Sequence, residues 1–86
     1  WAGWVRWGSD GPINASWSLN DNGTLATNTA PQEYGYWVEV GQYVEMLYPC
    51  TRGTFICHFR GRRFGDTISG TATTNEGHSA TFQMER

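Results

Sequence analysis

The residues best suited to metal or redox chemistry are two cysteines and two histidines: Cys50, Cys57, His58 and His78. Two thiolates and two imidazoles can hold Zn²⁺ in a tetrahedron, but their spacing here matches no zinc motif. Cys57 and His58 are adjacent, so in a strand their side chains point to opposite faces. We therefore expect no metal and no cofactor. In an oxidising compartment we expect a disulfide between Cys50 and Cys57.

His58 is the best candidate for a general base, and Glu45 on the preceding expected strand could orient it. Such a pair must lie within hydrogen-bond reach across the sheet. The sequence contains no Gly-x-Ser-x-Gly nucleophile motif. An ordinary surface histidine explains His58 better, so a cofactor-free barrel enzyme is only a third functional hypothesis.

Arg62 and Arg63 precede Phe64 and stand between Gly61 and Gly65. Glycines at this spacing predict an exposed turn, where two guanidinium groups could hold a carboxylate or phosphate. The formal net charge of −2 argues against nucleic acid as the partner. We expect the two arginines to recognise a single acidic group on a ligand or partner.

Aromatic residues are abundant, with five Trp, four Tyr and four Phe in 86 residues. Trp1, Trp4 and Trp7 are three apart, a spacing typical of neither a strand nor, with its glycines, a helix. They could close one end of the core, or Trp4 and Trp7 could form an exposed contact surface. The segment from Tyr36 to Tyr48 is bulky on both faces of its predicted hairpin, so its outer face could meet a partner.

Alternation of apolar and polar residues predicts the elements that position these groups. The expected strands cover residues 13–19, 24–29, 35–40, 43–48, 54–60, 67–73 and 79–85, and residues 1–7 could add an eighth. Turn residues separate them, most clearly at Asn22-Gly23. The inward positions predict a core of Trp17, Trp37, Phe55, Phe59, Ile68, Phe82 and Met84.

Seven or eight strands at spacings near ten residues predict an all-β antiparallel meander closing into a barrel, with a β-sandwich as the alternative. One domain covers residues 1–86, because the chain is short and contains no linker. No apolar run approaches the roughly 20 residues that a membrane-spanning helix requires.

Several segments resemble the small calycin-type barrels, which include lipocalin-like and avidin-like proteins. The similar residues are Trp17-Ser-Leu19, Asn22-Gly-Thr-Leu25, Gly35-Tyr-Trp37, Val44, Gly65-Asp-Thr-Ile-Ser-Gly-Thr71 and Phe82-Gln-Met-Glu-Arg86. The resemblance implies an up-and-down barrel that binds a ligand at its open mouth. It carries over no individual ligand-binding residue, and the short strands of this chain predict an interior mostly filled by side chains.

These observations predict a small exported binding module for an apolar, aromatic or sugar-like ligand. The alternative is a structural or interaction protein that self-assembles or binds a protein partner. Export is expected from the few charges, the strands rich in glycine, threonine and asparagine, and the first residue, which is not Met. Asn14 and Asn22 match the glycosylation acceptor pattern, which matters only in a eukaryotic secretory pathway. The predicted contact residues are Trp4, Trp7, Tyr36, Tyr43, Arg62 and Arg63.

Overall fold

The computed structural model describes residues 1–28, 35–50 and 55–86, without the side chains of Cys50 and Phe55. These residues form eight strands and no helix, so none of their segments is a helix that could cross a membrane. The strands are β1 (Ala2–Trp7), β2 (Ile13–Leu19), β3 (Thr24–Thr27), β4 (Gly35–Val40), β5 (Tyr43–Cys50), β6 (Phe55–Phe64), β7 (Thr67–Thr74) and β8 (Ser79–Glu85).

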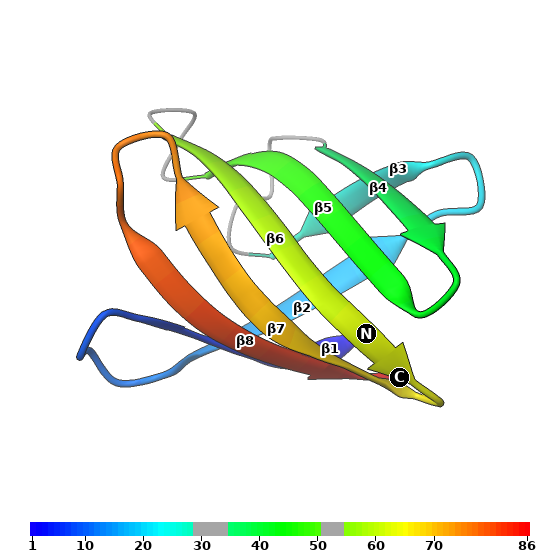
Figure 1. Ribbon diagram of the computed structural model, residues 1–86, viewed down its shortest axis with the longest axis horizontal. Coiled ribbons are helices and arrows are strands. Elements are labelled where there is room, and N and C mark those ends of the chain that lie inside the picture. The colour runs from blue at the N-terminus through cyan, green and yellow to red at the C-terminus, as the bar shows by residue number, and fades with distance from the viewer. Residues whose placement is uncertain (29–34, 51–54) are drawn as a thin grey trace.

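The strands make a closed up-and-down barrel in which each strand pairs with the next along the chain (Figure 1). Closure comes from β1 and β8, which pair antiparallel from Ala2 opposite Glu85 to Trp7 opposite Ala80. Both ends of the chain therefore lie close together at one end of the barrel. The predicted all-β barrel is confirmed, and the sandwich alternative is wrong because one continuous sheet closes on itself.

The tryptophan-rich start of the chain is a full barrel strand, which the three-residue spacing of its tryptophans concealed. Val5 is buried, and Trp1 and Trp7 pack against the core, while Arg6 is exposed. The inward set alternates as residues 1, 3, 5 and 7, with a glycine at position 3. Trp4 therefore faces outward, and the three tryptophans do not form one ladder.

The predicted turn over residues 61–66 is wrong, because β6 continues to Phe64 and the chain turns at Gly65 and Asp66. Gly61 is a strand residue that pairs with Val44 on one side and Gly70 on the other. Because Gly61 has no Cβ, it allows its neighbours in the barrel to approach closely. A Cβ at Gly61 would lie 2.9 Å from Cζ of Phe82.

The hairpin predicted at Asn22-Gly23 is present, and it joins β2 to β3. Gly23 has a φ of 86°, a left-handed conformation that glycine adopts without steric cost. The Asn22 side-chain oxygen accepts hydrogen bonds from the backbone N–H of Thr24 at 3.1 Å and from its hydroxyl at 2.6 Å. Asn22 is thus engaged in the turn, as its sequence context indicated.

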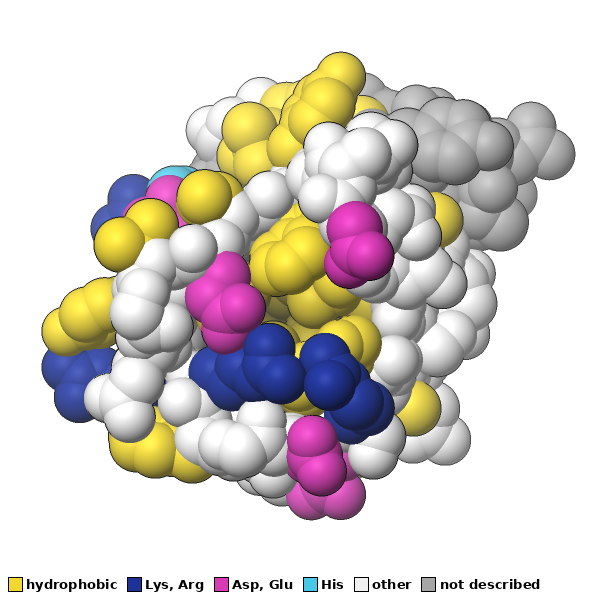
Figure 2. All heavy atoms as spheres, turned by 90° about the vertical axis from the view of Figure 1, so that its right-hand side faces the viewer, with side chains coloured by type: hydrophobic (Ala, Val, Ile, Leu, Met, Phe, Trp, Pro, Cys, Tyr) yellow, Lys and Arg dark blue, Asp and Glu magenta, His cyan; other side chains and the backbone are white. Residues whose placement is uncertain are grey.

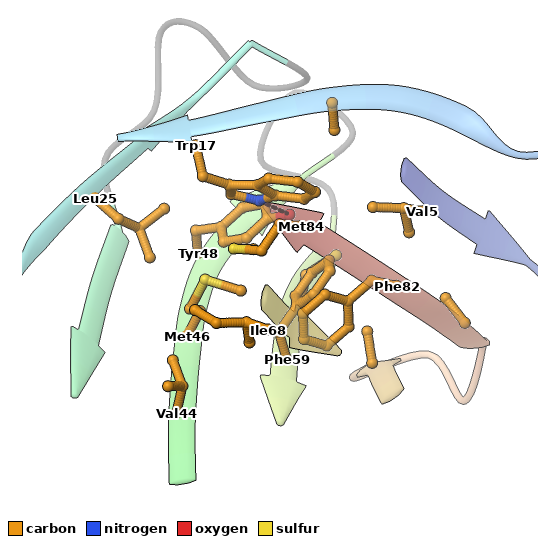
Figure 3. Packing of buried hydrophobic residues seen from close by; sticks show 14 residues of the cluster. Val5, Trp17, Leu25, Val44, Met46, Tyr48, Phe59, Ile68, Phe82 and Met84 are labelled. Atoms are coloured by element: carbon orange, nitrogen blue, oxygen red, sulfur yellow. Dashed lines mark hydrogen bonds between the residues drawn. The ribbon is translucent and has the colours of Figure 1, made fainter. Parts of the chain in front are cut away.

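An aromatic cluster fills the barrel interior (Figure 3). Phe59 lies at its centre, with ring centroids 5.2 Å from Tyr48, 5.0 Å from Phe82 and 6.3 Å from Trp17. The indole N–H of Trp17 donates to the Tyr48 hydroxyl at 3.4 Å, so its polar edge has a partner inside the core. Aromatic pairs in such edge-on and stacked geometries add roughly 0.5–1.5 kcal/mol each beyond burial.

Five of the seven predicted core residues are fully buried: Trp17, Phe59, Ile68, Phe82 and Met84. Trp37 is half-buried, packs against the core and donates its indole N–H to the Asn20 carbonyl at 2.8 Å. The side chain of Phe55 lies outside the described residues.

Candidate functional site

The outer wall of β4, β5 and β6 carries most of the exposed apolar side chains. Of the eight large hydrophobic residues exposed in the described part of the chain, only Ile13 lies elsewhere. The other seven define what we call the β4–β6 face: Tyr36, Val38, Val40, Tyr43, Leu47, Ile56 and Phe64. Alternation explains their position, because the residues between them along β5 and β6, such as Met46 and Phe59, fill the core.

Strand register aligns this face into rows that cross the sheet. The rows, from β4 to β6, are Tyr36–Leu47–His58, Val38–Glu45–Arg60 and Val40–Tyr43–Arg62. Neighbouring strands lie roughly 4.8 Å apart, so side chains within a row are in contact range. Each row places an apolar residue on β4 and a basic or titratable residue on β6. Glu45 is the acidic member of the set.

Tyr43 and Arg62 form an aromatic–guanidinium pair at one end of the face. The Arg62 Nη2 donates to the Tyr43 hydroxyl at 2.8 Å, and the guanidinium carbon lies 5.0 Å from the ring centroid. Tyr43 is 57% exposed even so. Tyrosine and arginine together are the residue types that most often dominate protein recognition.

His58 lies diagonally across from Glu45, with 3.6 Å between Nε2 and the carboxylate Oε2, which is longer than the hydrogen bond that a base and its orienting carboxylate require. The imidazole also meets the Arg60 guanidinium, whose Nε lies 3.4 Å from Nε2. A guanidinium at that distance competes with Glu45 for the same ring nitrogen. The arrangement is an exposed polar cluster on the β4–β6 face, and Thr73 of β7 is the cross-strand neighbour of His58 on its other side.

Two hollows open on this outer wall. One of about 580 Å³ lies over β5, β6 and β7, between the rings of Tyr43 and Phe64, with Arg60 and Arg62 beside them and Gly70 among its lining residues. The other, of about 420 Å³, lies over β4, β5 and β6. Its lining includes Tyr36, Val38, Glu45, Leu47 and His58. Glu45 borders both hollows, so they meet near the middle of the face.

Arg62 and Arg63 do not act together, because consecutive strand residues point to opposite sides of the sheet. Arg63 lies at the end of the barrel, where its guanidinium is 5.1 Å from the ring of Trp1 and 3.3 Å from a Glu39 carboxylate oxygen. Arg86 approaches the same indole at 4.8 Å. The predicted two-arginine clamp on an exposed turn is therefore wrong.

Figure 2 shows this end of the barrel from outside. Hydrophobic side chains lie in its centre, arginine side chains cross them, and acidic side chains stand around the rim. Arg63 also donates from Nε to the Gly65 carbonyl at 3.0 Å. Trp1 and Arg63 are thus engaged with each other and their neighbours, and Trp1 packs against the core at this end.

The remaining predicted contact residues are scattered. Trp7 faces inward and packs against the core, while Trp4 faces outward on β1, opposite Asn14 of β2 and Gln83 of β8. Of the six predicted contact residues, only Tyr36, Tyr43 and Arg62 share one face. The residues of this wall that were not among the predicted contact residues are Val38, Val40, Leu47, Ile56, Arg60 and Phe64. Their outward alternation on the two-sided hairpin and on β6 was the signal that could have found them.

The expected disulfide stays a prediction, because the side chain of Cys50 lies outside the described residues. Cys57 is fully buried and pairs in register with Tyr48. Among the described residues, no three histidine, cysteine or acidic side chains come close enough to hold a metal ion.

Comparison with known protein families, with curated proteins and with solved structures gives no match.

Proposed function

We propose that this protein is an interaction module that binds a protein partner through the β4–β6 face. One observation carries the proposal: seven of the eight exposed large hydrophobic residues in the described chain gather on that face. Single exposed apolar residues are ordinary, but a contiguous group of this kind is typical of an interaction surface.

The composition of the face supports a protein partner. It combines two tyrosines and a phenylalanine with arginines and one carboxylate, a mixture enriched at protein interfaces. Tyr36 is 69% exposed, with its cross-strand partner Leu47 on β5 and Val38 two residues along β4 on the same side of the sheet. Burying these groups against a partner would contribute about 25 cal/mol per Å² of apolar surface removed from water.

The interior offers less support for a ligand inside the barrel. Trp17, Phe59 and Phe82 are each almost fully buried and occupy the space between the walls (Figure 3). At one end of the barrel, Trp1 packs against the core and contacts the guanidinium groups of Arg63 and Arg86. A ligand deep in this barrel would have to displace core side chains.

A small acidic ligand is the second candidate, and the larger hollow favours it. Its volume of about 580 Å³ falls within the range of small-molecule sites. Tyr43 and Phe64 could stack on an aromatic or sugar ring, while Arg60 and Arg62 could bind a carboxylate. Native mass spectrometry of protein purified from its source would detect such a ligand as a defined added mass. That mass should disappear in Arg62→Gln.

Site-directed photo-crosslinking tests the protein-binding proposal directly. A benzophenone amino acid replaces Leu47 on the face, and in a matched control it replaces Ile13, which is exposed to a similar extent (46% and 53%) on another wall. Illumination in extracts of the source cells should give discrete adducts from position 47 alone. The proposal is wrong if position 47 yields no adduct, or the same adducts as position 13.

A further inference from the structure

We infer that the partner on the β4–β6 face is a second copy of this chain, related by a two-fold axis that runs parallel to the strands between β5 and β6. The inference rests on the proposed function and names its partner. It is carried by the order of charged and apolar residues across the face. A two-fold interface requires that if residue i meets residue j of the partner, residue j also meets residue i of the partner.

The middle row of the face satisfies that condition. Glu45 and Arg60 are direct cross-strand neighbours on β5 and β6. Rotation about an axis between these strands places Glu45 of each copy opposite Arg60 of the other. Two reciprocal ion pairs result at the centre of the contact, where opposite charges fix register and exclude wrong partners.

The neighbouring rows agree with the same axis. Tyr43 and Arg62 are also register partners, so each tyrosine ring would meet the arginine of the other copy, a cation–π arrangement. Leu47 would meet His58 in the next row. Each row therefore brings together different side chains rather than two like charges.

Two other axes parallel to the strands, one along β5 and one along β6, fail on charge. An axis along β5 would place Glu45 against Glu45 of the other copy. An axis along β6 would place Arg60 against Arg60 and Arg62 against Arg62. Like charges facing each other in an interface are destabilising. Among the three positions, the axis between β5 and β6 alone pairs opposite charges.

The apolar surface is sufficient for a modest interface. An aromatic side chain presents about 150–250 Å², and Tyr36, Tyr43 and Phe64 are each more than half exposed. These three rings alone offer roughly 300–450 Å² per copy, and the four aliphatic residues of the face add to it. Specific interfaces start near 1,200 Å² in total, or about 600 Å² per copy. We therefore expect a dimer of roughly micromolar affinity.

Charge reversal with mixing tests the axis. Glu45→Arg places an arginine opposite Arg60 in each of the two facing pairs, and Arg60→Glu places a glutamate opposite Glu45 in each pair. Sedimentation velocity of purified protein should show a concentration-dependent dimer for the unaltered chain. Each variant alone should associate at least roughly tenfold more weakly. A one-to-one mixture of the two variants should restore the dimer, because every facing pair again has opposite sign.

Mixing the two variants distinguishes an effect on the interface from an effect on the stability of a single chain. Glu45 and Arg60 are also neighbours within the sheet, so either change alone can lower stability modestly, but such a loss cannot be repaired by a second chain. Arg6→Glu, on the exposed side of β1, is the control and should leave association unchanged.

Two outcomes overturn the inference. One is an unaltered chain that stays monomeric up to about millimolar concentration, roughly a thousandfold above the expected dissociation constant; the other is a mixture that fails to associate better than either variant alone. If the pure chain is monomeric while the crosslinker at Leu47 captures a different protein, self-association is refuted and the proposed function stands. If the crosslinker at position 47 also captures no protein, the proposed function is wrong as well.

Discussion

Alanine in place of Gly70 should destabilise this barrel severely, although it adds only one methyl group. Gly70 of β7 faces Gly61 of β6 at an inward position. A Cβ built on Gly70 would lie 2.0 Å from the carbonyl oxygen of Arg60 and 2.6 Å from Cα of Gly61. Both contacts are with backbone, so no side-chain rotation can relieve them. The two strands would have to separate at this pair.

The expected cost follows from these contacts. Overpacking of this kind costs typically 1–3 kcal/mol. Separating the strands would also weaken one or two ladder hydrogen bonds, worth about 0.5–1.5 kcal/mol each. Alanine offsets about 0.4–1 kcal/mol by restricting the unfolded chain. The net loss is about 2–4 kcal/mol, from a total stability of roughly 4–13 kcal/mol for 86 residues at 0.05–0.15 kcal/mol per residue.

Urea unfolding measures this loss, and Gly11→Ala provides the matched control. Gly11 lies in the loop between β1 and β2 with no heavy atom within 4 Å of its would-be Cβ and no left-handed backbone. The control should change the free energy of unfolding by no more than about 1 kcal/mol, in the stabilising direction. Equal stability of Gly70→Ala and Gly11→Ala would refute the close approach of β6 and β7.

Two further comparisons probe the tryptophans and the barrel end. Trp37→Ala should cost about 2–4 kcal/mol in urea unfolding, since its half-buried ring packs on the core, whereas outward Trp4→Ala should cost under about 1 kcal/mol. Equal losses would place both rings in the core. Arg63→Gln should cost about 1 kcal/mol by removing the contacts to Trp1 and Glu39, a loss that should shrink in 1 M salt. An unchanged melting temperature would show that these contacts add nothing.

The strands were predictable wherever alternation and burial agreed. Apolar and polar side chains alternate without interruption over residues 13–19 and 79–85. The structure gives β2 and β8 the same bounds. The first strand was harder because tryptophan occupies both faces: Trp1 and Trp7 point inward and Trp4 outward. Residue type cannot distinguish the inward side of a strand from the outward side when tryptophan occupies both.

The misplaced turn near residue 61 has a different cause. Glycine usually marks a turn, but Gly61 is in a strand because Gly70 and Phe82 approach it from elsewhere in the barrel. Nothing in residues 58–66 alone specifies that approach. The same error moved Arg62 and Arg63 onto a shared turn, whereas a strand sends them to opposite sides. Two adjacent arginines could bind one anion together in a turn, but not in a strand, where their side chains point to opposite sides.

The division of side chains between the two sides of the wall supports the proposal that the outer side is the one that binds a partner. In β5, Val44, Met46 and Tyr48 are buried, so their side chains pack in the core. The alternate positions, Tyr43 and Leu47, gain less from folding because about half of each side chain stays exposed. A bulky residue that does not stabilise the fold contributes instead when a partner removes it from water. Replacing Leu47 with Ser should therefore leave the melting temperature unchanged and weaken association. A drop in melting temperature of several degrees would mean that this wall already packs within the monomer.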